Sequence, residues 1–413
     1  MPMAGDSGMN DSGGATTGER LHALDLVRAG ALLLGIVFHA AIPFLPEFDL
    51  WLVLDQVRSR PVGWLTFTLH TFRMTTFFLL AGYFGRMLLV RRGASGFIRD
   101  RSKRILAPLV IFWLPVLLLY GLALALAVYL GATPAGSELA EPPALTVDAW
   151  PLMHLWFLYV LLILYAAVLI VRSAVAAVDR GGKLRGAVDR MLATALRLPL
   201  VLPLLLALPV MALLLNQPEW AEFWGIPTPE KGFVPNTAAL GTYGLVFGLG
   251  WLVQRSKDGV APLARLWAPY LLAALVLTAG CLAITDVPLF EPQLEGDTRR
   301  LFAALYAAAA WLWSFGLVGA ALRFIRGENP TIRYLADSSY WLYIMHLPLL
   351  VALGAVVASW QLPAGLKLLL VVLAATAILL GSYHVMVRST WLGALLNGKR
   401  YPRRAKPSLE LAS

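Results

Sequence analysis

Charged residues are scarce in this sequence, and cysteine is almost absent. Of the 413 residues only 14% are charged, whereas 59% are hydrophobic, and the mean hydropathy is +0.71. So little polar surface cannot cover a soluble globule of this size, which excludes the soluble protein classes. The single cysteine, Cys281, excludes an intrachain disulfide and a metal site built from cysteines. The composition therefore indicates an integral membrane protein.

Long apolar stretches recur along the whole chain, each close to the roughly twenty residues that cross a bilayer as a helix. Because they do not alternate strictly with polar residues, they predict helices. We expect an all-α, polytopic membrane helix bundle with about ten transmembrane helices. The expected spans are 24–45, 62–90, 105–131, 151–171, 198–216, 238–254, 267–285, 300–322, 335–358 and 365–387.

No polar stretch is long enough to form a second, soluble domain. We therefore expect one transmembrane domain over residues 23–391. The Gly/Ser/Thr-rich residues 1–22 are predicted to be a disordered cytoplasmic tail. Residues 392–413 are predicted to be a basic cytoplasmic tail.

Lysine and arginine crowd the connections that lie on one side of the membrane if the spans alternate. These connections hold 24 of the 34 basic residues, and the opposite connections hold five. Positive charge marks the cytoplasmic side, so both termini are predicted to be cytoplasmic in a multi-pass protein of the inner (plasma) membrane. The opposite connections are acidic, with Glu138, Glu141 and Asp286 among their residues. This topology explains the net charge of +10 without nucleic acid as a partner. The basic segment 172–197 is expected to include a short amphipathic helix on the membrane surface.

Several ionisable residues fall inside the expected spans, where they usually face a protein interior or a water-filled path. Asp25, Arg28 and His39 share one stripe of the first span, because eleven residues return nearly to the same helix face. His154, at the outer edge of its span, is interpreted first as an interhelical hydrogen-bonding residue. Other polar residues at similar depth are His70, Arg73, Ser339, Tyr343 and His346. The pattern predicts a polar path through the bundle.

Five short motifs follow one another between residues 24 and 348. They are Leu24-Asp25-Leu26-Val27-Arg28 with His39, FFLLAGYF at 77–84, FIRDRSKRILAP at 97–108, HLWFL at 154–158, and SSYWLYIMHLP at 338–348. In type and order they resemble the acyltransferase 3 family of multi-span membrane O-acyltransferases. Within the family, His70-Thr-Phe-Arg73 and HLWFL are most similar to the branch that contains the glucan succinyltransferase of glucan biosynthesis (glucan biosynthesis protein C).

The resemblance implies transfer of an acyl group from a cytoplasmic acyl-CoA to a hydroxyl at the outer face of the membrane. A neutral imidazole suits deprotonation of a hydroxyl, and this role is assigned to His39. Oxyanion stabilisation could come from Arg73, His70 or Tyr343. The remaining catalytic candidates are Ser339, which could orient a catalytic group, and His346. A thioester can be attacked without a metal, so no metal is predicted.

The phosphates of the implied CoA donor require cations at the inner mouth of the path. Arg101 and Arg104, three residues apart, would supply them, and Arg28 would line the path of the pantetheine arm. Without the resemblance, Arg101 and Arg104 indicate only the topology of the chain.

Two other functions remain open from the sequence. A lipid-linked glycosyltransferase would be consistent with Glu47, Asp49 and Asp55 in the first outer connection, and it would depend on a divalent metal. A small-molecule transporter would also explain buried arginine and histidine along a path. For the acyltransferase, the acyl group (acetyl or succinyl) and the glycan or glycoside acceptor are left open, as are protein partners.

Overall fold

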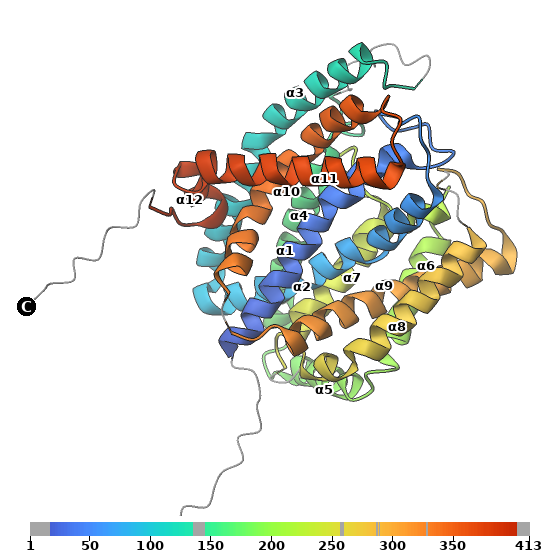
Figure 1. Cartoon of the computed structure of the whole chain (residues 1–413). Helices are drawn as coiled ribbons and strands as arrows, with labels where there is room; N and C mark the ends of the chain where they lie inside the picture. The colour runs from blue at the N-terminus through green and yellow to red at the C-terminus, as the bar shows by residue number, and fades with distance from the viewer. Residues whose placement is uncertain are drawn as a thin grey trace, which may run out of the picture.

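The computed structural model describes residues 17–134, 145–256, 260–285, 288, 290–327 and 329–402, and the described chain is built from helices gathered into one bundle (Figure 1). The longer helices are α1 (Thr17–Ala41), α2 (Arg60–Arg101), α3 (Ala107–Tyr129), α4 (Trp156–Val178), α7 (Thr237–Val253), α8 (Ala261–Ile284), α9 (Gly296–Phe324), α10 (Pro330–Val357) and α11 (Ala364–Ser382). The shorter helices are α5 (Lys183–Leu196), α6 (Leu202–Leu215) and α12 (Trp391–Asn397). Single turns are η1 (Ile42–Phe44), η2 (Ser102–Leu106), η3 (Met153–Leu155), η4 (Glu222–Trp224) and η5 (Tyr383–Val387).

The helices coincide with the apolar stretches of the sequence, which confirms the all-α architecture. Within the described residues, seven helical runs are long and apolar enough to cross a membrane, and one of them, Arg60–Tyr129, contains two expected spans. The other two expected spans correspond to α6 and α7, with 14 and 17 residues. A helix of that length rises only about 21–26 Å, less than the roughly 30 Å of a bilayer core. The figure of about ten crossings therefore stays a prediction.

The outward side of α3 is covered by apolar side chains. Val110, Leu114, Leu118 and Leu122 are all more than half exposed. An apolar face of this extent on a soluble protein would mark a contact surface, and here lipid provides the natural covering. The helix thus supports a multi-pass membrane protein. Residues 1–16 and 403–413 of the expected tails, and Glu138, Glu141 and Asp286, lie outside the described residues.

Glycines allow α2 and α7 to approach until their backbones touch. A Cβ added at Gly82 would lie 2.0 Å from the carbonyl oxygen of Phe247, and one added at Gly250 would lie 1.9 Å from that of Leu79. Membrane helices associate through such small residues because lipid provides no hydrophobic drive between them. This contact fixes α2, which carries many of the candidate site residues.

The α2 helix is broken at Gly93, whose backbone dihedral angles (φ 67°, ψ 179°) are not helical. Residues other than glycine adopt this backbone conformation only with strain. In a straight helix Arg92 and Asp100 would lie about 12 Å apart along the axis. With the break, Nη1 of Arg92 lies 2.9 Å from Oδ1 of Asp100. The π-helical turn η2 begins directly after the end of α2 at Arg101, and π-helical turns are frequent at functional sites.

The two ends of the bundle differ in the polar residues that they contain. At one end, which we name the basic end, His22 and Lys399 line the same cavity, so both described chain ends lie on one side. At the opposite, far end, the buried Lys367 donates to Asp55 at 2.6 Å and to the carbonyl of Trp360 at 2.9 Å. This pair ties the start of α11 to the loop that follows η1.

The expected amphipathic helix in 172–197 is present as α5. Asp179 caps its first turn by accepting from the backbone N–H groups of Leu184 and Arg185. The N–H of Arg185, and its guanidinium, hold the pKa of the Asp179 carboxyl below its usual range. Along α5 only Leu192 is buried, which agrees with a helix at the surface of the bundle.

Candidate active site

A cavity of about 200 Å³ at the basic end collects the three arginines that the sequence assigned to donor binding. Arg28 reaches it from α1, Arg101 from the end of α2, and Arg104 from η2. Ser339 and Tyr343 reach it from α10. We name it the basic cavity.

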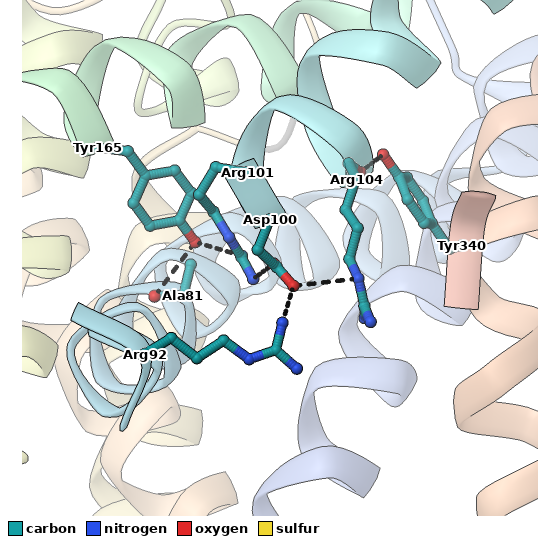
Figure 2. A network of polar contacts seen from close by, with 7 residues as sticks. All are labelled: Ala81, Arg92, Asp100, Arg101, Arg104, Tyr165 and Tyr340. Atoms are coloured by element: carbon teal, nitrogen blue, oxygen red, sulfur yellow. Dashed lines mark hydrogen bonds and ion pairs between the residues drawn. The ribbon is translucent and has the colours of Figure 1, made fainter. Parts of the chain in front are cut away.

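One carboxylate, Asp100, pairs with two arginines of this cavity, Arg101 and Arg104, and with Arg92 beside it (Figure 2). It is buried, and its oxygens lie 2.9 Å from Arg92, 2.6 Å from Arg101 and 3.4 Å from Arg104. Two positive charges remain after this pairing, so the cluster can still attract an anion. The hydroxyl of Tyr340 donates to the backbone carbonyl of Arg104 at 2.7 Å, which holds η2 against α10.

Arg28 is held separately on the α1 side of the basic cavity. Its guanidinium lies 2.9 Å from Asp25, one turn earlier in α1, and 5.3 Å from the ring centre of Phe84. The expected stripe of Asp25, Arg28 and His39 on α1 is therefore present, although Asp25 pairs with Arg28 and does not reach the basic cavity.

Deeper in the bundle, a smaller cavity of about 30 Å³ is lined by three histidines and an arginine, and we name it the histidine chamber. His39 comes from α1, Arg73 from α2, His154 from η3 and His346 from α10. The ring of His346 lies 5.2 Å from that of His39 and 5.0 Å from that of His154. The volume has room for about one water molecule.

The hydrogen bonds of two chamber histidines determine which ring nitrogen is available. Nδ1 of His346 lies 2.6 Å from the carbonyl oxygen of Tyr343, and Nε2 of His154 lies 3.0 Å from that of Ile344. A carbonyl oxygen can only accept, so these nitrogens carry the protons. Nε2 of His346 and Nδ1 of His154 are then lone-pair acceptors, and both are buried without a partner among the described residues. Nδ1 of His39 is likewise buried without a partner among the described residues.

Arg73 enters the chamber across a glycine. A Cβ added at Gly35 would lie 2.9 Å from Nη1 of Arg73 and 3.8 Å from Nε2 of His346. The guanidinium also lies over the ring of Phe38, 4.4 Å from its centre. Gly35 and Phe38 together therefore aim the positive charge of Arg73 toward the histidines.

Two of the catalytic candidates lie outside the chamber. His70 is buried beside Phe38 and Trp224, at ring distances of 5.3 and 6.1 Å, and is not among the described residues that line either cavity. Ser339 lines the basic cavity, and its hydroxyl donates to the carbonyl of Ala336 at 2.8 Å. Tyr343 lines both cavities, and its hydroxyl donates to the carbonyl of His154 at 2.7 Å.

The basic cavity and the histidine chamber are neighbours. Leu32, Phe77, Phe157 and Tyr343 line both of them. Arg28 lines the basic cavity and His39 lines the chamber, and these four side chains form a wall between the two spaces. A slim group held in the basic cavity has only this wall between it and the histidines.

Sequence reasoning did not identify two residues that the geometry makes central. Asp100 stands among six cations in 91–104, and that excess was a signal that a buried counter-ion was needed. His154 was interpreted as an interhelical hydrogen-bonding residue. It does bond to α10, but it also lines the chamber. Within the described residues, no group of three or more His, Cys, Asp or Glu is placed to hold a metal ion.

Similarity to known proteins extends over most of the chain. The acyltransferase domain of the acyltransferase 3 family matches residues 21–387. The chain is 33% identical over 150 residues to glucans biosynthesis protein C of Shigella dysenteriae serotype 1 (strain Sd197) and to that of Escherichia coli (strain SMS-3-5 / SECEC). Each alignment covers 35% of this chain, and the chain spans only 37% of the length of these relatives. No solved structure matches the chain.

Proposed function

Because this chain belongs to the acyltransferase 3 family and is therefore an acyltransferase, we propose that it transfers an acyl group from an acyl-CoA in the basic cavity to a hydroxyl that reaches the histidine chamber. The observation that carries the proposal is the shared wall of Leu32, Phe77, Phe157 and Tyr343. It puts a cationic cavity suited to a phosphate-bearing donor directly beside a cluster of imidazoles suited to proton transfer.

In this proposal His39 is the general base. It takes the proton of the acceptor hydroxyl while the oxygen attacks the thioester carbonyl. The new C–O bond forms, the C–S bond breaks, and the leaving thiolate of CoA takes up the proton that His39 removed. Arg73 faces the chamber and would stabilise the negative charge on the carbonyl oxygen in the tetrahedral intermediate.

His346 and Tyr343 have supporting roles in the proposed reaction. Nε2 of His346 is a buried acceptor near His39, so it would orient the acceptor hydroxyl or relay its proton. Tyr343 forms part of the wall, where its ring would position the thioester. Ser339 would contact the donor arm in the basic cavity. His70 packs against Phe38 and would have no direct contact with the reacting groups.

The proposed topology follows from the charge distribution. The basic end would face the cytoplasm with both termini, and the far end would face outward from the inner membrane. The transmembrane domain would comprise residues 23–391; of the expected tails at 1–22 and 392–413, residues 17–22 belong to helix α1 and residues 392–397 to helix α12. With about ten crossings, the short helices α6 and α7 would each have to span the membrane, either with little tilt or by thinning the bilayer locally.

The acceptor is proposed to be a glycan or glycoside at the outer face. The support is the name of the similar proteins, which are glucans biosynthesis proteins C. The acyl group would be acetyl or succinyl, and both are small enough to pass a narrow wall of side chains.

A complementation experiment tests the catalytic assignment. Surface and periplasmic glycans from a deletion strain carrying the wild-type protein, His39→Ala or His384→Ala would be compared by mass spectrometry. His39→Ala should reduce acylation by about 100-fold or more, the typical contribution of a general base. His384 is exposed near the end of α11, so His384→Ala should retain acylation. Normal acylation by a well-expressed His39→Ala protein would contradict the role of His39.

A further inference from the structure

A second groove, of about 530 Å³, opens beside the basic cavity and shares Arg104 with it. One wall is the segment around the Gly93 break and η2, and the other is α12 with Gly398. Its charged lining residues are Arg92, Arg99, Asp100, Lys103 and Arg104. We name it the phosphate groove.

The charge of this groove is strongly positive. Its single carboxylate, Asp100, pairs with Arg92 and Arg104 and also with Arg101 of the basic cavity. Arg99 and Lys103 are exposed and form no ion pair with any described residue. Two free cations and the partly neutralised guanidiniums of Arg92 and Arg104 therefore face one space.

Arg104 joins the groove to the basic cavity, because it lines both. Gly398 closes on it from α12: a Cβ added there would lie 1.8 Å from Nη2 of Arg104, and the positive φ of 75° suits only glycine well. The side chain of Arg104 is thus held at the junction of the two spaces. A ligand longer than either space could bind in both by passing Arg104.

Acyl-CoA has the shape and charge that such a pair of spaces requires. Its nucleotide end carries a pyrophosphate and a 3′-phosphate, whereas its thioester ends a slim, uncharged pantetheine arm. Resting on the proposed function, we propose that the phosphate groove binds the phosphate-bearing nucleotide end of the donor through Arg92, Arg99, Lys103 and Arg104. One guanidinium group can donate two parallel hydrogen bonds to the oxygens of a phosphate, and a lysine ammonium adds a positive charge. The arm then runs past Arg104 into the basic cavity.

Binding measurements on the full-length protein in nanodiscs test this inference without knowledge of the acyl group or the acceptor. The probes are CoA and pantetheine, which lacks all of the phosphates. The variant Arg99→Ala/Lys103→Ala should raise the Kd for CoA about tenfold or more and leave the Kd for pantetheine unchanged. The control is Arg91→Ala, because Arg91 is an exposed arginine of the same segment that does not line the groove. It should leave both constants unchanged.

The contrary outcomes are distinct. An unchanged Kd for CoA in the double variant, or equal weakening of CoA and pantetheine, would overturn the phosphate groove. A wild-type protein that binds neither probe would instead contradict the proposed function.

Nanodiscs with and without phosphatidylglycerol separate donor phosphate from lipid phosphate. If the double variant loses phosphatidylglycerol association but keeps its affinity for CoA, the groove binds lipid headgroups and the inference is wrong. His39→Ala, which alters only the proposed chemistry, should bind CoA as the wild type does.

Discussion

Gly35 determines where the Arg73 guanidinium can lie. Any side chain at this position of α1 would come within 2.9 Å of Nη1 of Arg73, closer than ordinary contacts allow. Arg73 is buried, so it has little room to move away without leaving the histidine chamber. At the scale of single residues, the chamber thus depends on the absence of a side chain as much as on the histidines themselves.

We expect Gly35→Ala to lower kcat about tenfold or more, equivalent to about 1.4 kcal/mol of transition-state stabilisation, because the Arg73 charge moves away from the reacting carbonyl. Steady-state kinetics on purified protein would measure it. Gly30→Ala on the same helix is the matched control, since a Cβ at Gly30 meets nothing within 4 Å. Equal activity of the two variants would show that Arg73 does not need its present position.

Single residues were predicted well where one helix carried the information. The spacing of Arg28 and His39 was enough to predict one face of α1, because helix periodicity is a local property, and the path between them stays a prediction. The family resemblance was confirmed, whereas the donor-binding role that it implies for Arg101 and Arg104 stays a prediction. The position of His70 behind Phe38 could not be predicted, because sequence gives the depth of a residue in a helix bundle but not which neighbour its face meets.

At the scale of helices, the contact between α2 and α7 depends on two glycines that meet backbone with backbone. Gly82→Ala or Gly250→Ala should force the helices apart and destabilise the protein by about 1–3 kcal/mol, the usual effect of overpacking. Thermal unfolding in detergent would measure the loss. Gly248→Ala, on the same helix with nothing within 4 Å of its Cβ, should unfold near the wild-type temperature. A wild-type Tm for Gly250→Ala would contradict the close contact.

Helix boundaries were predicted less well than helix existence. The second span was expected to end at 90, followed by a connection, yet the chain stays helical to Arg101 except at Gly93. The expected span follows the apolar stretch, whereas the helix continues through charged residues, because arginine is a good helix former. Conversely, the fifth span was expected to begin at 198, whereas α6 begins at Leu202 with Pro203 in its first turn. Proline favours a helix start, and this signal marked the boundary.

At the scale of the whole molecule, the buried pair of Lys367 and Asp55 connects segments more than 300 positions apart. Their side chains are 0% and 1% exposed. Lys367→Met should destabilise the protein by about 3–5 kcal/mol, because it leaves the Asp55 carboxylate buried without its counter-ion. Thermal unfolding would measure this, and the double variant Lys367→Met/Asp55→Leu should recover much of the loss. No recovery would indicate that packing around Lys367 matters more than the charge.

The overall architecture was largely predictable, because hydropathy and charge distribution act over the whole chain. The all-helical bundle and the common side of the two described chain ends agree with the predictions. The number of crossings stays a prediction because α6 and α7 are short. The convergence of α1, α2, η3 and α10 on one chamber required tertiary packing, which no local pattern encodes.

Leu32, Phe77, Phe157 and Tyr343 also bear on how such a bundle keeps the membrane sealed. A hydrated ion would have to shed its water shell to squeeze past three aromatic rings and a leucine, and an apolar constriction opposes this strongly. A pantetheine arm that ends in an acetyl thioester carries no charge and has no such shell to lose, whereas a succinyl group would bring one carboxylate to the wall. The same partition that would admit the acyl group would therefore block ion leakage and preserve the membrane potential.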